Sequence, residues 1–206
     1  MSQPKATRVR LRGPERHQQL LDLARRSYLE VGIDRTSMHK VAQAAGVNIA
    51  TMYQHFASTD QLFREALLDP LDASLADQMA AANERLQGLD TRDSLRELHR
   101  SLLRMMNEHG TTLNAVFVAR NELGRQHVKE VVWPSIEAWV NEVLDGLGST
   151  RKGAIRPALA PALAGVYLWL SMHEGYRDNQ AIPEHWAERI ADLLYAGAVG
   201  PPHKAR

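Results

Sequence analysis

Two short helical patterns joined by a glycine, within residues 36–56, constrain the fold of this chain more than any other feature. The first pattern carries apolar residues at i, i+3, i+4 and i+7: Met38, Val41, Ala42 and Ala45. Because this spacing places them on one helix face, that face is expected to pack against a core. Gly46 can then end the first helix in the left-handed conformation, and Asn48 is a suitable N-cap for the second. The pattern predicts two helices held at a fixed angle by a tight turn.

The second of these helices has an outward face suited to hydrogen bonding. Met52, Tyr53 and Phe56 are expected on its inward or bordering side. The outward residues are small or uncharged: Ile49, Ala50, Thr51, Gln54 and His55. A helix that lies in the DNA major groove needs such a face, because bulky or acidic side chains block access to base edges. The alternative is an ordinary helical hairpin within a core, since short helices, a glycine turn and an apolar stripe occur widely.

The flanking sequence predicts one helix on each side of this hairpin. Upstream, Pro14 and Gly32 bound a helical repeat formed by Leu20, Leu21, Ala24, Ser27, Tyr28 and Val31. Downstream, Ser58 and Gln61 have the spacing of a capping box, and an apolar stripe follows them. Pro70 is expected to kink or interrupt that last helix. The first 70 or so residues are therefore expected to form three small helices and the start of a longer one.

Charge is unevenly distributed along the chain. Residues 1–64 contain ten Lys/Arg and five Asp/Glu, a net charge of +5; because the whole chain carries +1, residues 65–206 carry −4. This asymmetry suits a polyanionic partner at one end only. Four basic residues precede the first helix in a segment without apolar periodicity: Lys5, Arg8, Arg10 and Arg12. Residues 1–13 are therefore expected to be a mobile basic arm, with a solvated tail as the alternative.

The run from Thr36 to Phe56, with Ala-Gly-Val at 45–47 and followed by Ser58, resembles the helix-turn-helix of TetR-type (TetR/AcrR) bacterial transcriptional regulators. Thr51, Tyr53 and the pair His55-Phe56 are part of this resemblance. It is specific over residues 14–74, whereas the rest of the chain matches only in length and helical character. The resemblance implies an N-terminal three-helix DNA-binding domain followed by a helical domain that binds a ligand and dimerises.

The resemblance also implies roles for individual residues. Thr36 and Ser37 would hydrogen-bond phosphates, and Tyr53 and His55 would clamp the DNA backbone. The residues near base edges would be Ile49, Ala50, Thr51 and Gln54, next to the cap residue Asn48. The chain departs from the family pattern at Ala50, where members usually carry glycine, and at Thr59, where they carry a phosphate-binding lysine. The second departure suggests that Arg8, Arg10 and Arg12 of the arm contribute more of the affinity here.

The composition excludes several other classes of protein. The chain has 206 residues and no cysteine, so it has neither a disulfide framework nor a thiolate zinc site. No apolar run approaches the length of a membrane span, and the charged N-terminus lacks the hydrophobic segment of a signal peptide. A soluble cytoplasmic protein without a membrane partner is the expectation.

Residues 75–200 are expected to form a second, all-helical domain, with 201–206 as a flexible tail. No segment shows sustained alternation of apolar and polar residues, so no sheet is expected. Breaks are expected at Gly88, Gly110, Gly124, residues 146–153 and residues 179–183. These breaks delimit helical segments at 93–109, 111–123 and 126–147, and Pro134 is expected to bend the last of them.

The last two helical segments indicate a subunit interface. Segment 156–178 is nearly apolar around its circumference, and segment 183–199 carries an apolar face. A helix that is apolar all round must be buried on two sides, and a second subunit can provide the second side. The resemblance implies the same arrangement, a homodimer built as a four-helix bundle. The alternative is a well-buried core helix.

No catalytic constellation stands out. His173-Glu174 lacks the second histidine of a zinc-protease motif, and Gly146 to Gly153 lacks the order of a phosphate-binding loop. No enzyme activity, metal or cofactor is expected. A ligand pocket needs apolar lining and a few convergent polar groups, and the helical body supplies both. The candidate lining residues are Met105, Met106, His109, Phe117, Arg120, Asn121, Trp133, Glu137, Trp139 and Tyr167. Core filler with satisfied polar neighbours is the alternative for each of them.

The sequence favours a ligand-responsive DNA-binding regulator. The preferred form is a repressor that a small apolar or amphipathic effector releases from a palindromic double-stranded DNA operator. An activator or a ligand-independent regulator of the same fold is the main alternative. An all-helical enzyme or carrier would leave the basic N-terminal hairpin unexplained.

Overall fold

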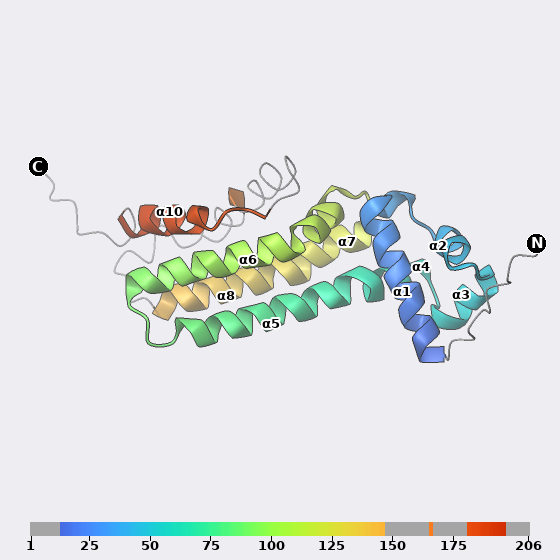
Figure 1. Ribbon diagram of the computed structural model, residues 1–206, viewed down its shortest axis with the longest axis horizontal. Helices are drawn as coiled ribbons and strands as arrows, with labels where there is room; N and C mark the ends of the chain where they lie inside the picture. The colour runs from blue at the N-terminus through green and yellow to red at the C-terminus, as the bar shows by residue number, and fades with distance from the viewer. Residues whose placement is uncertain (1–12, 147–164, 167–180, 197–206) are drawn as a thin grey trace, which may run out of the picture. The chain divides into compact units, whose positions relative to one another are not determined.

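The computed structural model describes residues 13–146, 165–166 and 181–196. Every described element is a helix, as the sequence predicted, and the chain divides into two compact units, Met1–Asp69 and Pro70–Arg206 (Figure 1). The expected domain boundary at residue 74 lies a few residues beyond this division. None of the described helices combines the length and hydrophobicity that a membrane span requires.

The first unit is built on α1 (Gly13–Glu30), against which the following short elements pack, except α3, which packs on α2. These are the 3-10 turn η1 (Ile33–Arg35), α2 (Met38–Ala45), α3 (Ile49–His55), α4 (Thr59–Phe63) and the π turn η2 (Arg64–Leu68). Their buried side chains share one small core, which includes Leu20, Ala24, Tyr28, Met38, Val41, Met52, Phe56, Leu62, Phe63 and Leu67. The apolar stripe of residues 38–45 faces this core at Met38, Val41 and Ala42, as predicted.

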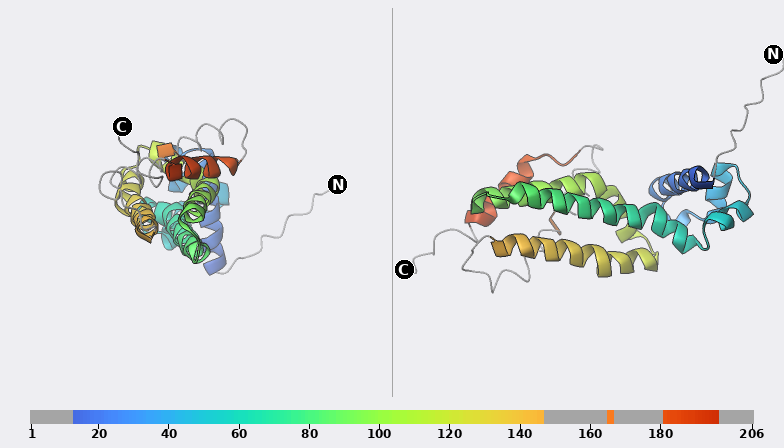
Figure 2. Two further views of the ribbon diagram at one scale, coloured as in Figure 1. Left: turned by 90° about the vertical axis from the view of Figure 1, so that its left-hand side faces the viewer. Right: turned by 90° about the horizontal axis from the view of Figure 1, so that it is seen from below.

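The second unit contains longer helices. They are α5 (Asp69–Leu86), α6 (Thr91–Val118), α7 (Glu122–His127), the π turn η3 (Val128–Val132), α8 (Trp133–Gly146) and α10 (His185–Leu194). Figures 1 and 2 show α5, α6 and α8 side by side, with α10 along α6. Their common core is lined by Leu71, Leu75, Ala82, Leu98, Leu102, Leu103, Met105, Leu113, Val132, Trp139, Val140, Ile182 and Ala187.

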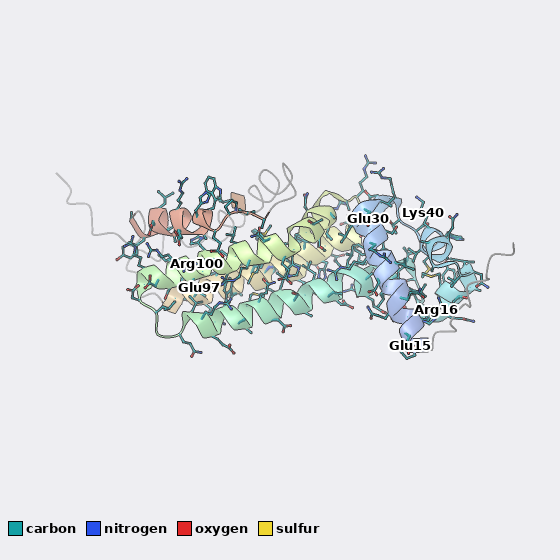
Figure 3. All side chains as sticks on the ribbon, in the orientation of Figure 1. Glu15, Arg16, Glu30, Lys40, Glu97 and Arg100 are labelled. Carbon is teal, nitrogen blue, oxygen red and sulfur yellow. The ribbon has the colours of Figure 1, made fainter. Side chains whose placement is uncertain are left out.

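Polar contacts fix α10 on α6. Arg92 and Arg96 both pair with Asp192, at 3.1 Å, and Arg100 pairs with Glu188 at 2.9 Å. The side chain of Asn107 bonds both backbone groups of one residue ahead of α10: its Nδ2 donates to the Ile182 carbonyl, and its Oδ1 accepts the Ile182 N–H. Figure 3 labels Arg100 on α6, together with the nearby Glu97.

Both prolines that were expected to disturb helices follow a π turn. The Asp69 N–H bonds to the Arg64 carbonyl and the Trp133 N–H to the Val128 carbonyl, five residues back in each case. Pro70 and Pro134 come next. A proline ring clashes with the carbonyl four residues earlier in a regular α-helix, and a locally wider turn relieves that clash. The helix therefore continues past each proline.

Two of the predicted breaks are wrong. Gly110 lies inside α6, so the expected segments 93–109 and 111–123 form one helix. Gly124 lies inside α7, and the break comes earlier, at residues 119–121, where Asn121 caps the new helix. A glycine within a helix costs only about 1 kcal/mol, which the packing of a buried helix outweighs. The break at Gly88 is confirmed by its positive φ of 75°. Segment 156–178, apart from residues 165–166, lies outside the described residues.

Candidate nucleic-acid interface

The turn between α2 and α3 has the geometry that its residues require. Gly46 ends α2 with φ 64° and ψ 32°, the left-handed conformation in which a side chain is disfavoured. Asn48 then caps α3: its Oδ1 accepts the Thr51 N–H at 2.8 Å and lies 3.0 Å from the Thr51 hydroxyl. The Asn48 amide oxygen is therefore engaged in the cap, and its NH₂ group is the part that remains for a partner.

The outer face of α3 is exposed and uncharged. Tyr53 is 56% exposed, and Ala50 and Gln54 are also exposed, whereas Ile49, Thr51 and His55 are half-buried. Met52 and Phe56 are fully buried and hold the helix on the unit's core. The inward prediction is confirmed for Met52 and Phe56 and is wrong for Tyr53, which lies on the exposed side of α3. A helix that is anchored on one side and offers amide, hydroxyl and phenol groups on the other can enter a groove.

The residues ahead of α2 differ in role. Ser37 caps α2, because its Oγ accepts the Lys40 N–H, and its side chain is half-buried. Thr36 is 9% exposed and its hydroxyl faces inward, within 3.1 Å of the Ser27 hydroxyl, the Ser27 carbonyl and the Gly32 carbonyl. The expectation that the Thr36 hydroxyl contacts phosphate is therefore revised: it ties the turn after α1 to α1 itself.

The N-terminus of α4 is open to solvent. Ser58 caps it by accepting the Gln61 N–H at 3.1 Å, as the capping-box spacing predicted. The Gln61 side chain accepts the N–H of Ala57, one residue before the cap, at 2.6 Å, rather than that of Ser58 itself. Thr59, the residue at the family's lysine position, is exposed. The basic side chains of the described part of this unit are Arg16, Arg25, Arg26, Arg35, Lys40 and Arg64, and Figure 3 labels Arg16 on α1 and Lys40 on α2. Arg8, Arg10 and Arg12 lie outside the described residues.

The pKa values of two ionisable side chains in this unit, His55 and Tyr28, are shifted by their surroundings. Burial lowers the pKa of His55, and the neighbouring His17 and Arg16 lower it further. Burial also raises the pKa of Tyr28 to about 12, with Asp60 contributing. The Tyr28 hydroxyl has no hydrogen-bond partner among the described residues. Tyr28 therefore acts as a neutral core residue, and its ring packs edge-on against Phe63.

The candidate pocket residues are dispersed over the second unit. Met105, His109 and Trp139 are buried; Met106, Asn121, Trp133 and Glu137 are half-buried; Arg120 is exposed. The Asn121 side chain caps α7, and the Trp139 indole donates to Asn83 Oδ1 at 2.7 Å. Both polar groups therefore have structural partners. The Phe117 side chain and Tyr167 lie outside the described residues.

A cavity of about 360 Å³ lies elsewhere in this unit, where the end of α5, the start of α6 and the end of α8 meet. Its lining residues are Asn83, Leu86, Gln87, Leu89, Thr91, Ser94, Glu142, Val143 and Gly146. None of the candidate pocket residues is among them. Sequence reasoning missed this cavity because it is formed by three segments whose proximity no local pattern reveals.

The anchored hairpin, the capped and exposed α3 and the open N-terminus of α4 define a helix-turn-helix DNA-binding unit. Residues 20–66 match the family described as "Bacterial regulatory proteins, tetR family". This part of the chain is therefore similar to the TetR-type regulatory proteins, and the relatives and structural neighbours that the whole chain resembles are transcriptional regulators.

Individual relatives agree with this family. The chain is 26% identical over 185 residues to the uncharacterised regulator YhgD of Bacillus subtilis, covering 87% of this chain and 93% of YhgD. It is 33% identical over 101 residues to the probable regulator ArpR of Pseudomonas putida, covering 49% of this chain and only 46% of ArpR. A crystal structure of a TetR-family regulator from Mesorhizobium loti shares the fold, with a TM-score of 0.65, 22% identity and coverage of 92% and 97%.

Proposed function

We propose that this chain is a transcriptional repressor that binds a near-palindromic operator as a homodimer and leaves it when a small apolar or amphipathic effector binds. Residues 14–74 would form the DNA-binding domain and residues 75–200 the ligand-binding and dimerisation domain. The observation that carries the proposal is the exposed, uncharged outer face of α3 on a fully anchored helix.

Each group on this face suits one part of the DNA. Gln54 is exposed and carries an amide that can bond bidentately to an adenine edge. The Tyr53 phenol and His55, at the border of the face, would bond phosphates, and Ser37 would do so at the start of α2. Thr59 has no charge, so the arginines of residues 1–13 would supply part of the electrostatic attraction.

A dimer is supported by the outer face of α10. Leu193 is 73% exposed, and one and two turns before it Ile190 and Trp186 are half-buried against the core of the unit. An apolar side chain so exposed on a helix is one that a second copy of the chain can bury. Two copies would place two α3 helices in successive major grooves, about 34–36 Å apart, on a two-fold symmetric site.

An effector site is supported by the polar groups in the core of the second unit. α6 buries His99, Ser101, His109 and Thr112, and α7 buries His127; of these, Ser101 bonds to Glu97 and His127 pairs with Asp72. The side-chain oxygen of Gln78 is buried without a hydrogen-bond partner among the described residues. A ligand pocket typically combines apolar walls with a few such groups.

Ligands found in structural neighbours agree with this expectation. The FadR regulator of Bacillus subtilis was solved with stearoyl-CoA, and the multidrug binding protein EbrR with imidazole. An effector would release DNA only if it bound the DNA-incompetent conformer more tightly than the competent one.

The proposal is tested by selecting DNA from a pool of random duplexes with the full-length protein. We expect a two-fold symmetric consensus, and Gln54→Ala should relax preference at one base position in each half-site by about 1–3 kcal/mol. Gln126→Ala, which alters an exposed glutamine on α7, is the matched control and should leave the consensus unchanged. Failure to enrich any sequence, or an identical consensus with Gln54→Ala, would contradict the proposal.

A further inference from the structure

A histidine of α1 lies against the turn that joins α3 to α4. His17 Nε2 is 2.8 Å from Glu65 Oε2, and the two side chains are 32% and 28% exposed. The His17 ring centroid lies 4.6 Å from that of Phe56 and 5.7 Å from that of His55. One side chain thus contacts both the buried end of α3 and the residue proposed to clamp the DNA backbone.

Glu65 extends this contact to the backbone of the turn. Its second oxygen, Oε1, accepts a hydrogen bond from Gln61 Nε2 at 2.7 Å. Gln61 Oε1 in turn accepts the Ala57 N–H at 2.6 Å. A connected series of polar contacts therefore runs from His17 through Glu65 and Gln61 to the first residue after Phe56. Such series hold their members in one geometry only while each link is intact.

Other charges surround this series. Ionisable residues lie in the first turn of α1, in the elements packed on α1, and in α3. They are Glu15, Arg16, Asp34, Arg35, His39, Lys40, His55, Asp60, Arg64 and Glu65. Glu65 is the acidic residue for which the structure shows a direct contact with His17. Arg16 bonds to Gln19 and the Lys40 amine to the Arg35 carbonyl, so these cations are directed elsewhere.

We infer that His17 is a positioning residue for DNA binding: through its contacts with Glu65, Phe56 and His55 it holds the α3–α4 turn and His55 in the DNA-binding geometry. This inference rests on the proposed function. A charged partner makes a stronger hydrogen bond to the Glu65 carboxylate than a neutral one does. Replacing the imidazole should therefore weaken operator binding, and an arginine at this position should restore more of it than a neutral side chain.

His55 gives operator binding a pH dependence of its own. Its pKa is lowered in the free protein by burial, His17 and Arg16, and a nearby phosphate would favour its proton on binding. Affinity from this source falls as the pH rises. The role of His17 must therefore be separated from that of His55 by substitution.

The test measures affinity for the selected duplex at about pH 6 and about pH 8, at one salt concentration and with the full-length protein. His17→Gln keeps a polar contact with Glu65 but no charge, and should bind up to about fivefold more weakly than the wild type. His17→Arg keeps a charged partner for Glu65 at both pH values and should bind more tightly than His17→Gln at each of them. Glu65→Gln should weaken binding as His17→Gln does.

Two controls separate positioning from general destabilisation and from His55. Gln18→Ala removes only an exposed hydrogen bond to Asp22 on the same helix, so its profile should match the wild type. In a His55→Gln background the difference between Gln and Arg at position 17 should persist. Ring-proton NMR of His17 and His55 across the same pH range should show the resonances of His55 responding to substitution of His17.

The outcomes distinguish this inference from the proposed function. A wild-type protein that binds no duplex contradicts the proposed function itself. A wild type that binds its duplex, with His17→Gln and His17→Arg giving the same affinity and pH profile, refutes the role of His17 and leaves the proposed function standing. Rescue by arginine but not by glutamine supports the inference.

Discussion

Asn48 allows the stability of the DNA-binding unit to be separated from its affinity for DNA. Its amide oxygen accepts the Thr51 N–H at 2.8 Å and caps α3, while the residue itself is exposed. Asn48→Ala removes the cap and should destabilise the unit by about 1 kcal/mol. Asn48→Asp keeps a capping oxygen and adds a negative charge at the helix N-terminus, which is favourable by about 0.3–1 kcal/mol at low salt. The two variants should therefore change stability in opposite directions.

Both variants should bind DNA more weakly than the wild type, but for different reasons. Asn48→Ala loosens the first turn of α3, whereas Asn48→Asp places a carboxylate near the phosphates. Because that repulsion is electrostatic, adding salt should reduce the loss of DNA affinity in Asn48→Asp. The loss of affinity in Asn48→Ala should depend little on salt.

The assays can address each unit separately. All four tryptophans, Trp133, Trp139, Trp169 and Trp186, follow residue 69, so their fluorescence reports on the second unit. Urea unfolding followed by tryptophan fluorescence should be unchanged in both variants. Amide hydrogen exchange within residues 13–69 should be faster in Asn48→Ala and unchanged or slower in Asn48→Asp. Equal destabilisation by both variants would refute the capping role of Asn48.

Three further predictions concern other parts of the chain. Burial lowers the pKa of His99 to about 4, below its value in the unfolded chain. Because protonation then favours unfolding, the free energy of unfolding of the second unit should be constant above about pH 6.5 and fall by up to about 3 kcal/mol as the pH falls towards 4. Urea unfolding of His99→Gln should lack this part of the acid sensitivity. Leu193→Glu should yield monomers by sedimentation with unchanged helicity, and a dimer of that variant would exclude the exposed face of α10 as the interface. Deleting residues 1–12 should flatten the slope of log K against log salt by roughly 0.9 for each phosphate that the arm neutralises in the wild-type complex, and an unchanged slope would mean that the arm is only a solvated tail.

Local signals were sufficient to predict the helix-turn-helix unit. Gly46, Asn48 and Ser58 determine where α2 ends and where α3 and α4 begin, because left-handed glycine and side-chain caps act within a few residues of the backbone groups that they satisfy. The apolar spacing of residues 38–45 likewise predicted the buried face. Local chemistry could not show that the Thr36 hydroxyl is hydrogen-bonded inside the unit, because its partners belong to α1 and the turn that follows it.

The limits of the sequence are clearest in the second unit. Gly110 was predicted to end a helix, but α6 continues through it because the energy of packing its buried face exceeds the small cost of one glycine. Pro70 and Pro134 were recognised as disturbances, yet only the structure shows that a π turn accommodates each of them. The cavity between α5, α6 and α8 also depends on segments that are distant in sequence.

The sequence by itself determined the class of this protein and predicted which helix faces DNA, because periodicity, caps and turns are properties of neighbouring residues. Only the tertiary structure decided which polar side chains are hydrogen-bonded within the fold and which remain exposed for a binding partner. It also placed His17 beside Glu65, 48 residues further along the chain. Such pairings depend on how helices pack, and helix packing is a cooperative property of the whole core that no single segment encodes.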